Sequence, residues 1–291
     1  MTGNSIGPGG LEGRLITQKR RDRMKYARVI DKSGAVVLAA QGPDGGLVRC
    51  EGLSLVDPAA LRVTNEPVQP QRFLSPVDPR ALICVAASYR KHIEECNAVE
   101  QPEPVIFMKN PAAAQGHECP VVIPSVCGDE VDYEGELGVV IARDCCNLSR
   151  EETAEKIAGY TVVNDISARL WQLERGGGQW VRGKSFDTFA PMGPFLVTPD
   201  EVGDAGDLTI KTVLDGETVQ ESTTKQMIRG IAELISFLSQ GTTLLAGTVI
   251  LTGTPEGVGW HREPRKLLRP GSTVSVEIEK VGKLVNPVIA G

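Results

Sequence analysis

The segment that most constrains the fold runs from Val131 to Ile141, where polar and apolar residues alternate. Such alternation predicts a β-strand, whose successive side chains point to opposite faces. Asp132, Glu134 and Glu136 would then share one face, while the apolar residues face a core. Neighbours on one face lie about 6–7 Å apart, so these carboxylates repel one another unless a cation neutralises them. The segment predicts either a divalent-cation site or a solvated acidic edge strand.

A further acidic residue follows another apolar segment. Asp165 comes after Tyr160–Val163, which is typical of a buried strand, and before a helix expected over residues 168–174. It either joins the acidic group or caps that helix, a common place for Asp. A site built from carboxylate oxygens alone favours Mg²⁺, Mn²⁺ or Ca²⁺ over Zn²⁺.

Turn residues divide the rest of the chain into short segments. With 32 Gly, 19 Pro and only 4% aromatic residues, the composition favours many short strands and disfavours a helical repeat. Strands are expected over residues 26–30, 35–40 and 47–50, followed by a proline-rich linker over 66–79. We therefore predict a small β-rich N-terminal domain with a flexible start over residues 1–75, and a larger catalytic domain over 76–291.

The larger domain is expected to mix strands and helices. The apolar runs and alternations predict strands over residues 81–85, 248–251, 274–278 and 284–289. Besides the helix over 168–174, a capping-box pattern at Ser149–Glu152 predicts a helix over 150–158. Apolar residues at helical spacing predict another over 225–239. The fold class is therefore α+β.

Charge and cysteine content limit the partners and the compartment. A net charge of −6 disfavours nucleic acids and anionic membranes, which leaves a small-molecule partner. Seven cysteines without a C-x-x-C pair indicate reduced thiols. No apolar run approaches the roughly 20 residues that cross a bilayer. These features predict a cytoplasmic protein, and the basic stretch Arg14–Arg23 leaves a mitochondrial presequence as the alternative.

Five sequence blocks, taken together and in order, resemble the fumarylacetoacetate hydrolase family. The resemblance covers residues 80–291, and the blocks are CVAASYRKHIEE (84–95), DYEGEL (132–137), NDISAR (164–169), RGKSFD (182–187) and TGTPEGVG (252–259). It implies the family's mixed β-roll of the fumarylacetoacetase C-terminal type with flanking helices, paired as a homodimer. The family often has Asn at Ser88 and Asp at Leu170, and these departures bear on substrate preference.

The resemblance also implies a set of site residues. A divalent ion, Mg²⁺ or Mn²⁺ with Ca²⁺ a possibility in crystals, would be held by Glu134, Glu136 and Asp165. His92 and Glu95 would form a dyad that activates water or abstracts a proton, since residues three apart share a helix face. Lys184 would stabilise an oxyanion or enolate. The remaining implied residues would contact the substrate: Tyr89, Lys109, Gln172 and Thr254. His117 and His261 have no acidic residue three positions away, as His92 has, and are expected on the surface or in loops.

The implied activity is metal-dependent hydrolysis of a C–C bond in a β-diketo acid, such as an acylpyruvate or a fumarylacetoacetate-like substrate. The same residues also suit decarboxylation or tautomerisation of 2-oxo acids such as oxaloacetate, and isomerisation of 2-hydroxy-dienedioates, because each reaction passes through a stabilised enolate. A non-catalytic metal-binding β protein is a third interpretation. The hydrolase and the enolate-forming enzymes would give different products, and the non-catalytic protein would give no product.

Overall fold

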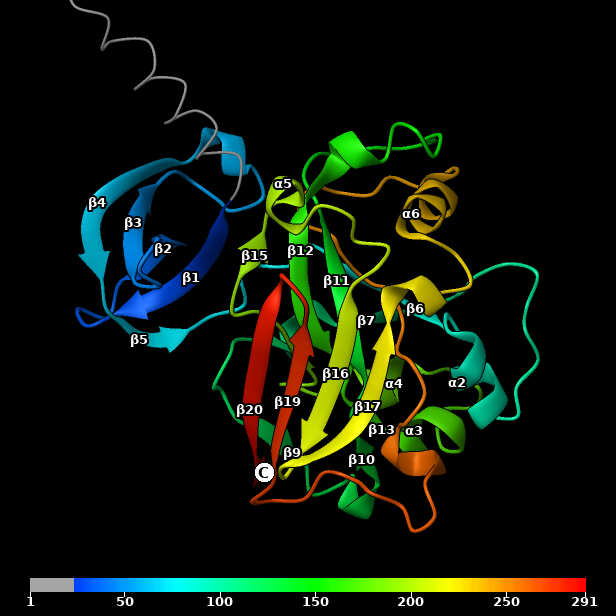
Figure 1. Cartoon of the computed structure of the whole chain (residues 1–291). Helices are drawn as coiled ribbons and strands as arrows, with labels where there is room; N and C mark the ends of the chain where they lie inside the picture. The colour runs from blue at the N-terminus through cyan, green and yellow to red at the C-terminus, as the bar shows by residue number, and fades with distance from the viewer. Residues whose placement is uncertain (1–23) are drawn as a thin grey trace, which may run out of the picture.

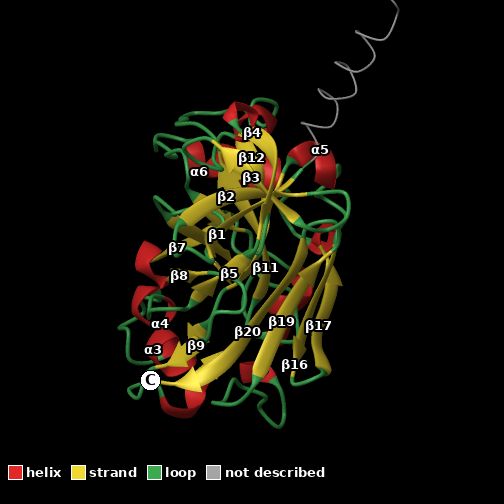
Figure 2. Ribbon diagram, turned by 90° about the vertical axis from the view of Figure 1, so that its left-hand side faces the viewer, coloured by secondary structure: helices red, strands yellow, loops and turns green. Residues whose placement is uncertain are grey.

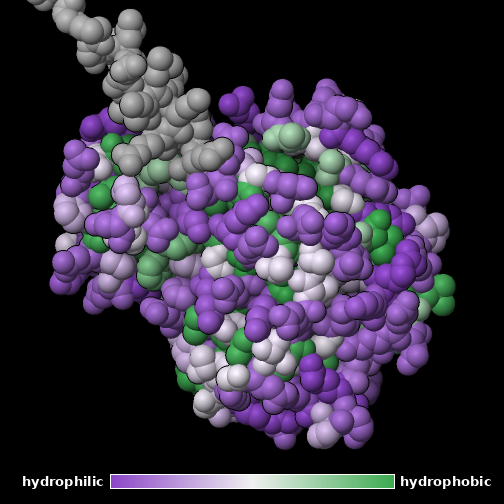
Figure 3. All heavy atoms as spheres, viewed as in Figure 1, coloured by the Kyte–Doolittle hydropathy of each residue, from purple (hydrophilic) through white to green (hydrophobic). Residues whose placement is uncertain are grey.

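The computed structural model describes residues 24–291, so the basic stretch 14–23 lies outside the described residues. The described chain is mostly strand with a few short helices (Figure 1), which confirms the predicted α+β class. All seven cysteines are free thiols in it. No helix among the described residues is long and apolar enough to cross a membrane. Hydrophilic residues predominate on the face shown in Figure 3.

The largest sheet has eleven strands in the order β4-β3-β2-β1-β15-β12-β11-β18-β6-β7, with β5 paired to β1. Its central strands β11 and β12 run antiparallel and are buried along almost their whole length, which fits their apolar sequences. The strands are β1 (Lys25–Asp31), β2 (Val36–Gln41), β3 (Leu47–Glu51), β4 (Arg62–Val68), β5 (Pro70–Phe73), β6 (Leu82–Ala86), β7 (Val105–Lys109), β11 (Gly135–Ile141), β12 (Ile157–Asn164), β15 (Leu196–Val197) and β18 (Val249–Leu251).

A second sheet packs against β11 and β12 (Figure 2), and its order is β17-β16-β19-β20-β9. Alternating apolar residues of the two layers, such as Leu137, Val162, Ile210, Val276 and Leu284, form a shared core between them. The strands of this sheet are β9 (Val121–Ile123), β16 (Thr209–Leu214), β17 (Glu217–Thr223), β19 (Thr273–Ile278) and β20 (Gly282–Ala290). The predicted terminal strands over 274–278 and 284–289 are confirmed.

The N-terminal strands form a small layer at one end of the main sheet (Figure 1). They have a core of their own, which includes Val29, Val37 and Val68. Backbone pairing of β1 with β15 joins this layer to the rest of the sheet. The expected proline-rich linker is partly wrong, because β5 and the end of β4 lie within it and β5 pairs with β1. The domain boundary near residue 75 stays a prediction.

The helices are short. They are α2 (Arg90–Glu95), α3 (Arg169–Leu173), α4 (Val181–Lys184), α5 (Pro199–Val202) and α6 (Ile231–Ser239). Of these, α5 and α6 lie at the opposite end of the molecule from α3 (Figure 1). The 3₁₀ turns are η1 (Pro58–Ala60), η2 (Pro111–Ala113), η3 (Gly128–Glu130), η4 (Ala154–Lys156), η5 (Thr224–Gln226) and η6 (Gly259–His261), and two short ladders pair β10 (Val131–Asp132) with β13 (Ser167–Ala168) and β8 (Ala114–Gln115) with β14 (Ala190–Pro191).

Two helix predictions need correction. The Ser149 amide does donate to Glu152 Oε2 (2.9 Å), but only turns and η4 follow, since β12 begins at Ile157 to pair with Ile141. Tertiary pairing thus overrides a local helix-start signal. The helix expected over 225–239 begins only at Ile231, because Met227 bridges to the backbone of Tyr89 instead.

Candidate active site

The acidic residues meet where the backbone is interrupted between β10 and β11. The predicted continuous strand over 131–141 breaks at Tyr133 and Glu134. At the break, the Glu134 amide donates a hydrogen bond to Asn164 Oδ1 (3.0 Å). The Asp165 amide then donates to the Glu134 carbonyl (2.8 Å). A side chain at Gly135 would collide with the Thr212 hydroxyl, so only Gly fits this close approach. These contacts bring the ends of β11 and β12 together.

Glu134, Glu136 and Asp165 form one buried cluster, which we call the acidic triad. One carboxylate oxygen from each lies within 4.8 Å of those of the other two. The side chains of Glu134 and Asp165 are 7% and 0% exposed, so water cannot screen their charges. The sequence-based expectation that Glu134 and Glu136 share a site therefore matches the geometry, and Asp165 joins them rather than capping α3, which has no side-chain cap.

Asp132 is not part of the acidic triad. Its Oδ2 accepts two hydrogen bonds from Arg169 (2.9 and 2.7 Å), and the amides of Gly259 and Trp260 also donate to its carboxylate. The expectation that Asp132 shares a face with the other two acids is wrong, because the strand is interrupted between them. Asp132 instead fixes Arg169 and η6.

Three buried cations surround the acidic triad. Lys184 Nζ lies 2.7 Å from Glu134 Oε2 and 2.8 Å from Asp165 Oδ2. Lys109 pairs with the other oxygen of Asp165 and donates to the Ile166 carbonyl (3.0 Å). Arg169 also reaches Glu134 Oε1 at 2.6 Å. Within residues 24–291, Glu136 has no such cation and accepts a hydrogen bond only from the Gly253 amide (2.7 Å).

The electrostatics of the triad differ from one carboxylate to the next. Burial, and then repulsion from Asp165 and Glu134, raise the pKa of Glu136 well above its ordinary value. Burial also acts on Glu134, but Lys184 and Arg169 outweigh it and lower its pKa. Glu136 therefore marks the position where negative charge is least compensated by the chain itself.

The donor set fits a hard divalent cation. Three carboxylate oxygens within 4.8 Å of one another are the ligand type that Mg²⁺, Mn²⁺ and Ca²⁺ prefer, and no thiol or imidazole belongs to the triad. A cation there would relieve the repulsion on Glu136. The identity of the ion stays a prediction.

His92 and Glu95 lie on α2, and their side chains meet as expected. His92 Nδ1 is 3.1 Å from Glu95 Oε2, while the Gly257 amide donates to Glu95 Oε1 (2.9 Å). Burial lowers the pKa of His92, but the contacts with Cys96 and Glu95 outweigh it and raise the pKa to about 9. Burial raises the pKa of Glu95, but the His92 and Gly257 contacts lower it below the ordinary value.

A cavity of about 320 Å³ is lined by His92 of the dyad and by Glu134 and Glu136 of the acidic triad, whereas Glu95 and Asp165 are not among its lining residues. Its walls include residues of α2, α3, α4 and η6, and the three helices are labelled in Figure 1. Its polar lining includes six of the predicted site residues: His92, Glu134, Glu136, Gln172, Lys184 and Thr254. The apolar lining includes Ile93, Phe107, Leu173 and Trp180. This mixture is typical of a small-molecule site.

Tyr89 and Lys109, both predicted to contact substrate, are buried and are not among the residues that line the cavity. Lys109 is committed to Asp165. Tyr89 is fully buried, and its hydroxyl has no hydrogen-bond partner within the described chain. Their substrate-binding roles stay predictions.

The structure also brings residues to the cavity that the sequence interpretation missed. Arg169 lines it and ties Asp132, Glu134 and Gln172 together. His261, expected to be a plain surface or loop residue, is exposed but lines the same cavity. Arg169 is the last residue of a family block and was open to prediction, whereas nothing near His261 in the sequence indicates the cavity.

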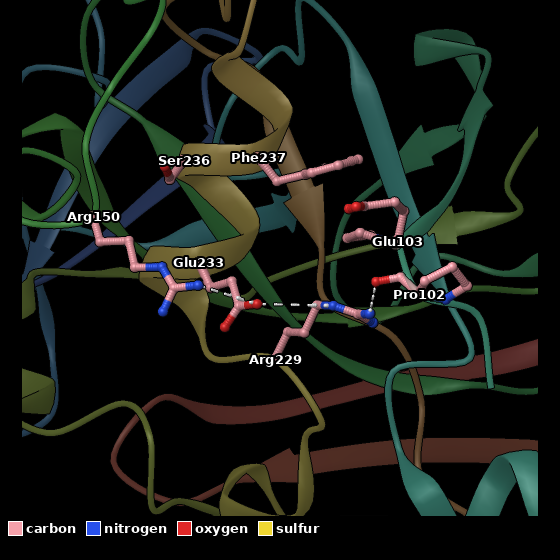
Figure 4. A pocket seen from close by; sticks show the side chains of 8 residues that line it. Pro102, Glu103, Arg150, Arg229, Glu233, Ser236 and Phe237 are labelled. Carbon is pink, nitrogen blue, oxygen red and sulfur yellow. Dashed lines mark hydrogen bonds and ion pairs between the residues drawn. The ribbon is translucent and has the colours of Figure 1, made fainter.

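A second pocket, of about 360 Å³, is lined by residues 102–104 of the segment that follows α2 and by residues of and near α6 (Figure 4). Arg229 donates to the carbonyls of Gln101 and Pro102, which follow α2 (3.0 and 2.5 Å). The Ile228 amide donates to the carbonyl of Ser88, just before α2 (2.8 Å). Residues 228–229 therefore bind the chain on both sides of the helix that carries the dyad.

With this geometry in view, comparison with known proteins identifies the family. The model of the fumarylacetoacetate hydrolase C-terminal domain matches residues 81–289. The chain belongs to the fumarylacetoacetate hydrolase family. The resemblance inferred from the five sequence blocks and the expected family fold are both confirmed, and the chain is an enzyme of this family.

Relatives within the fumarylacetoacetate hydrolase family carry several names. Oxaloacetate tautomerase FAHD2A, mitochondrial, from Bos taurus is 43% identical over 230 residues, which are 78% of this chain and 73% of that protein. Fumarylacetoacetate hydrolase domain-containing protein 2 homolog from Dictyostelium discoideum is 42% identical over 231 residues, 76% of this chain and 75% of that protein. The tautomerase name matches the alternative reaction rather than the hydrolase.

Solved structures of the fumarylacetoacetate hydrolase family superpose closely. A 5-carboxymethyl-2-hydroxymuconate delta-isomerase from Mycobacterium smegmatis has a TM-score of 0.78 and 35% identity, covering 92% of this chain and 100% of that one. A fumarylacetoacetate hydrolase from Exiguobacterium antarcticum has a TM-score of 0.79 and 33% identity with the same coverage. The same fold therefore occurs in proteins named as isomerases and in proteins named as hydrolases.

Proposed function

We propose that this enzyme interconverts the enol and keto forms of a small 2-oxo dicarboxylic acid, with oxaloacetate as the first candidate. The observation that carries the proposal is a single cavity lined by His92, Lys184 and the triad residues Glu134 and Glu136. Such a set can move one proton and stabilise an enolate, and tautomerisation needs nothing more. The names of relatives at 43% identity support the same reaction.

The residues would divide the work as follows. Because its pKa is raised to about 9, His92 holds a proton near neutral pH. It would deliver this proton to the enol carbon and then take the proton of the enol oxygen, so one O–H bond is replaced by one C–H bond and His92 regains its proton. Glu95 holds His92 Nδ1 and so leaves Nε2 to face the substrate. Lys184 donates two of its three N–H groups to Glu134 and Asp165. The third would donate to the enolate oxygen. A divalent cation held by the acidic triad would supply a Lewis acid that favours the enolate.

Formal charges favour an acidic substrate. When all four carboxylates are ionised, as a bound cation beside Glu136 would favour, they exceed the three buried cations by one negative charge: Asp132, Glu134, Glu136 and Asp165 against Lys109, Lys184 and Arg169. His92 and Glu95 add a pair of opposite charge. A divalent ion would turn the site to one net positive charge, which suits an anion.

Hydrolysis of a C–C bond is the second candidate, since the same dyad can activate water and since the Exiguobacterium hydrolase has the same fold at 33% identity. It also needs space for the attacking water beside the substrate. A purely structural metal site is disfavoured, because the triad opens onto a cavity of about 320 Å³.

The test is product analysis with metal-stripped enzyme, with and without Mg²⁺ or Mn²⁺, on oxaloacetate and acetylpyruvate. Tautomerisation changes the enol absorbance without loss of substrate mass. Decarboxylation releases CO₂, and hydrolysis incorporates solvent oxygen into a product acid. Metal-dependent enol–keto exchange of oxaloacetate that is lost in Glu134→Gln supports the proposal, whereas metal-dependent cleavage of acetylpyruvate alone supports the hydrolase.

The homodimer and the cytoplasmic location stay predictions. Several relatives are called mitochondrial in their names. Gel filtration with light scattering tests the first, and imaging of the tagged full-length protein tests the second.

A further inference from the structure

The inner cations of the cavity are already committed to the chain's own acids. Lys109 and Lys184 pair with the acidic triad, and Arg169 bonds to Asp132, Glu134 and Gln172. With a divalent ion, one net positive charge remains at this inner end, enough for one carboxylate. A dicarboxylic substrate, as the proposed function requires, leaves its second carboxylate toward the outer part of the cavity without a cation there.

His261 occupies that outer part on a backbone held from several sides. The amides of Gly259 and Trp260 both donate to Asp132 (2.8 and 3.0 Å), which also binds Arg169. Next to it, the Arg265 guanidinium stacks over the Trp260 ring at 3.6 Å. The imidazole is therefore carried on a turn anchored to the same carboxylate that fixes the inner site.

The imidazole of His261 has no bonding partner among the described residues. Within residues 24–291 no hydrogen bond or ion pair involves its ring, although it lines the cavity. The other polar residues at this wall are occupied or uncharged. Thr254 donates to the Gly135 carbonyl, and Gln172 accepts from Arg169. His261 is thus the one titratable group of the described lining that has both access to the cavity and no partner.

We propose that His261 binds the distal carboxylate of a 2-oxo dicarboxylic acid and so selects dicarboxylates over monocarboxylates. The inference rests on the proposed function, because that function places the 2-oxo carboxylate end of the substrate at the acidic triad. A charged imidazole at the outer end and one net positive charge at the inner end match the two carboxylates of such a substrate.

The charges around His261 agree with a role that appears only on binding. Burial and then Arg169 lower its pKa, with smaller effects of Glu95, His92 and Asp132. The ring is therefore neutral near pH 7 in the free protein. An anion beside it favours the protonated form, so a bound distal carboxylate would raise the pKa.

The test compares L-malate with L-lactate, which share a 2-hydroxycarboxylate head and differ in the distal carboxylate. Calorimetric titration of the whole protein in excess Mg²⁺ should give malate an affinity about tenfold higher than lactate, the size of one charge-assisted contact. His261→Ala should remove this preference with lactate affinity unchanged, and His261→Lys should retain it. Malate, but not lactate, should also shift the His261 imidazole NMR signal toward the protonated form.

Two outcomes would overturn the inference: equal binding of malate and lactate by the unaltered protein, or a malate preference that survives in His261→Ala. The proposed function fails separately. If the preference depends on His261 while oxaloacetate shows no metal-dependent enol–keto exchange, the dicarboxylate site stands and the reaction is a different one. If exchange occurs, His261→Ala should raise KM for oxaloacetate and leave kcat nearly unchanged.

Discussion

The two halves of the candidate site are built in opposite ways. The acidic triad and its lysines are buried and bound to one another, so each charge depends on its neighbours. The α2 segment and η6 carry partly exposed side chains that are fixed mainly through backbone contacts, such as the Gly257 amide on Glu95. The comparison indicates that the inner half holds charge at a cost in stability, while the outer half handles protons and substrate at little cost.

The largest effect is expected for Glu134→Gln. The change removes the negative charge that pairs with Lys184 and Arg169 and turns one of the two acceptor oxygens into an NH₂ donor, which leaves buried cations short of a partner. Breaking a buried ion pair costs about 3–5 kcal/mol, and turnover should be lost with it. Urea unfolding of the metal-free protein measures the loss, and a change below about 1 kcal/mol would contradict the description of the inner half.

His92→Gln should separate chemistry from stability. Turnover should fall by about 10²–10⁴-fold, the contribution of a general acid–base group. The free energy of unfolding should fall by less than in Glu134→Gln, because the pair with Glu95 is partly exposed and removing His92 leaves no buried cation without a partner. Steady-state kinetics and urea unfolding of the same preparation check both, with Glu95→Gln as the matched variant. Equal losses in the two halves would remove the distinction between them.

The pH response should also differ between histidines. In the metal-free protein, His92 should titrate near pH 9, while His117 and His261 should titrate below the ordinary value of 6.5. Since the folded-state pKa of His92 is raised, the stability it contributes is fully present below pH 6.5 and is lost as the pH rises through about 9. NMR titration of the chain's three histidines measures this. A His92 pKa at or below that of His261 would contradict it.

The smallest effect is expected for Arg229→Ala. Loss of its bonds to Gln101 and Pro102 should free the segment after α2 and lower kcat by about tenfold or less. Hydrogen exchange of residues 96–104 should increase. Arg150→Ala is the control, because Arg150 contacts Glu233 in the same pocket but neither carbonyl. Identical exchange in both variants would show that Arg229 does not hold the segment.

Local patterns in the sequence predicted part of this site. Alternation placed Glu134 and Glu136 on one face but left a solvated edge strand as an alternative, and the pairing of His92 with Glu95 was implied by the family resemblance rather than by spacing alone. Neither pattern shows that the strand breaks after Asp132, since the break depends on the contact of Glu134 with Asn164, which lies 30 residues after Glu134. The contact of Lys109 with Asp165 spans 56 residues. Such long-range contacts follow from sheet topology, which no local pattern contains.

The most direct test of the central claim is the rate of enol-oxaloacetate decay, followed by its ultraviolet absorbance with enzyme stripped of metal and then supplied with Mg²⁺. Mg²⁺ without enzyme gives the background. The account predicts a rate above that background that needs both enzyme and Mg²⁺ and disappears in His92→Gln and Glu134→Gln. A rate equal to the background, or one that both variants retain, would contradict it.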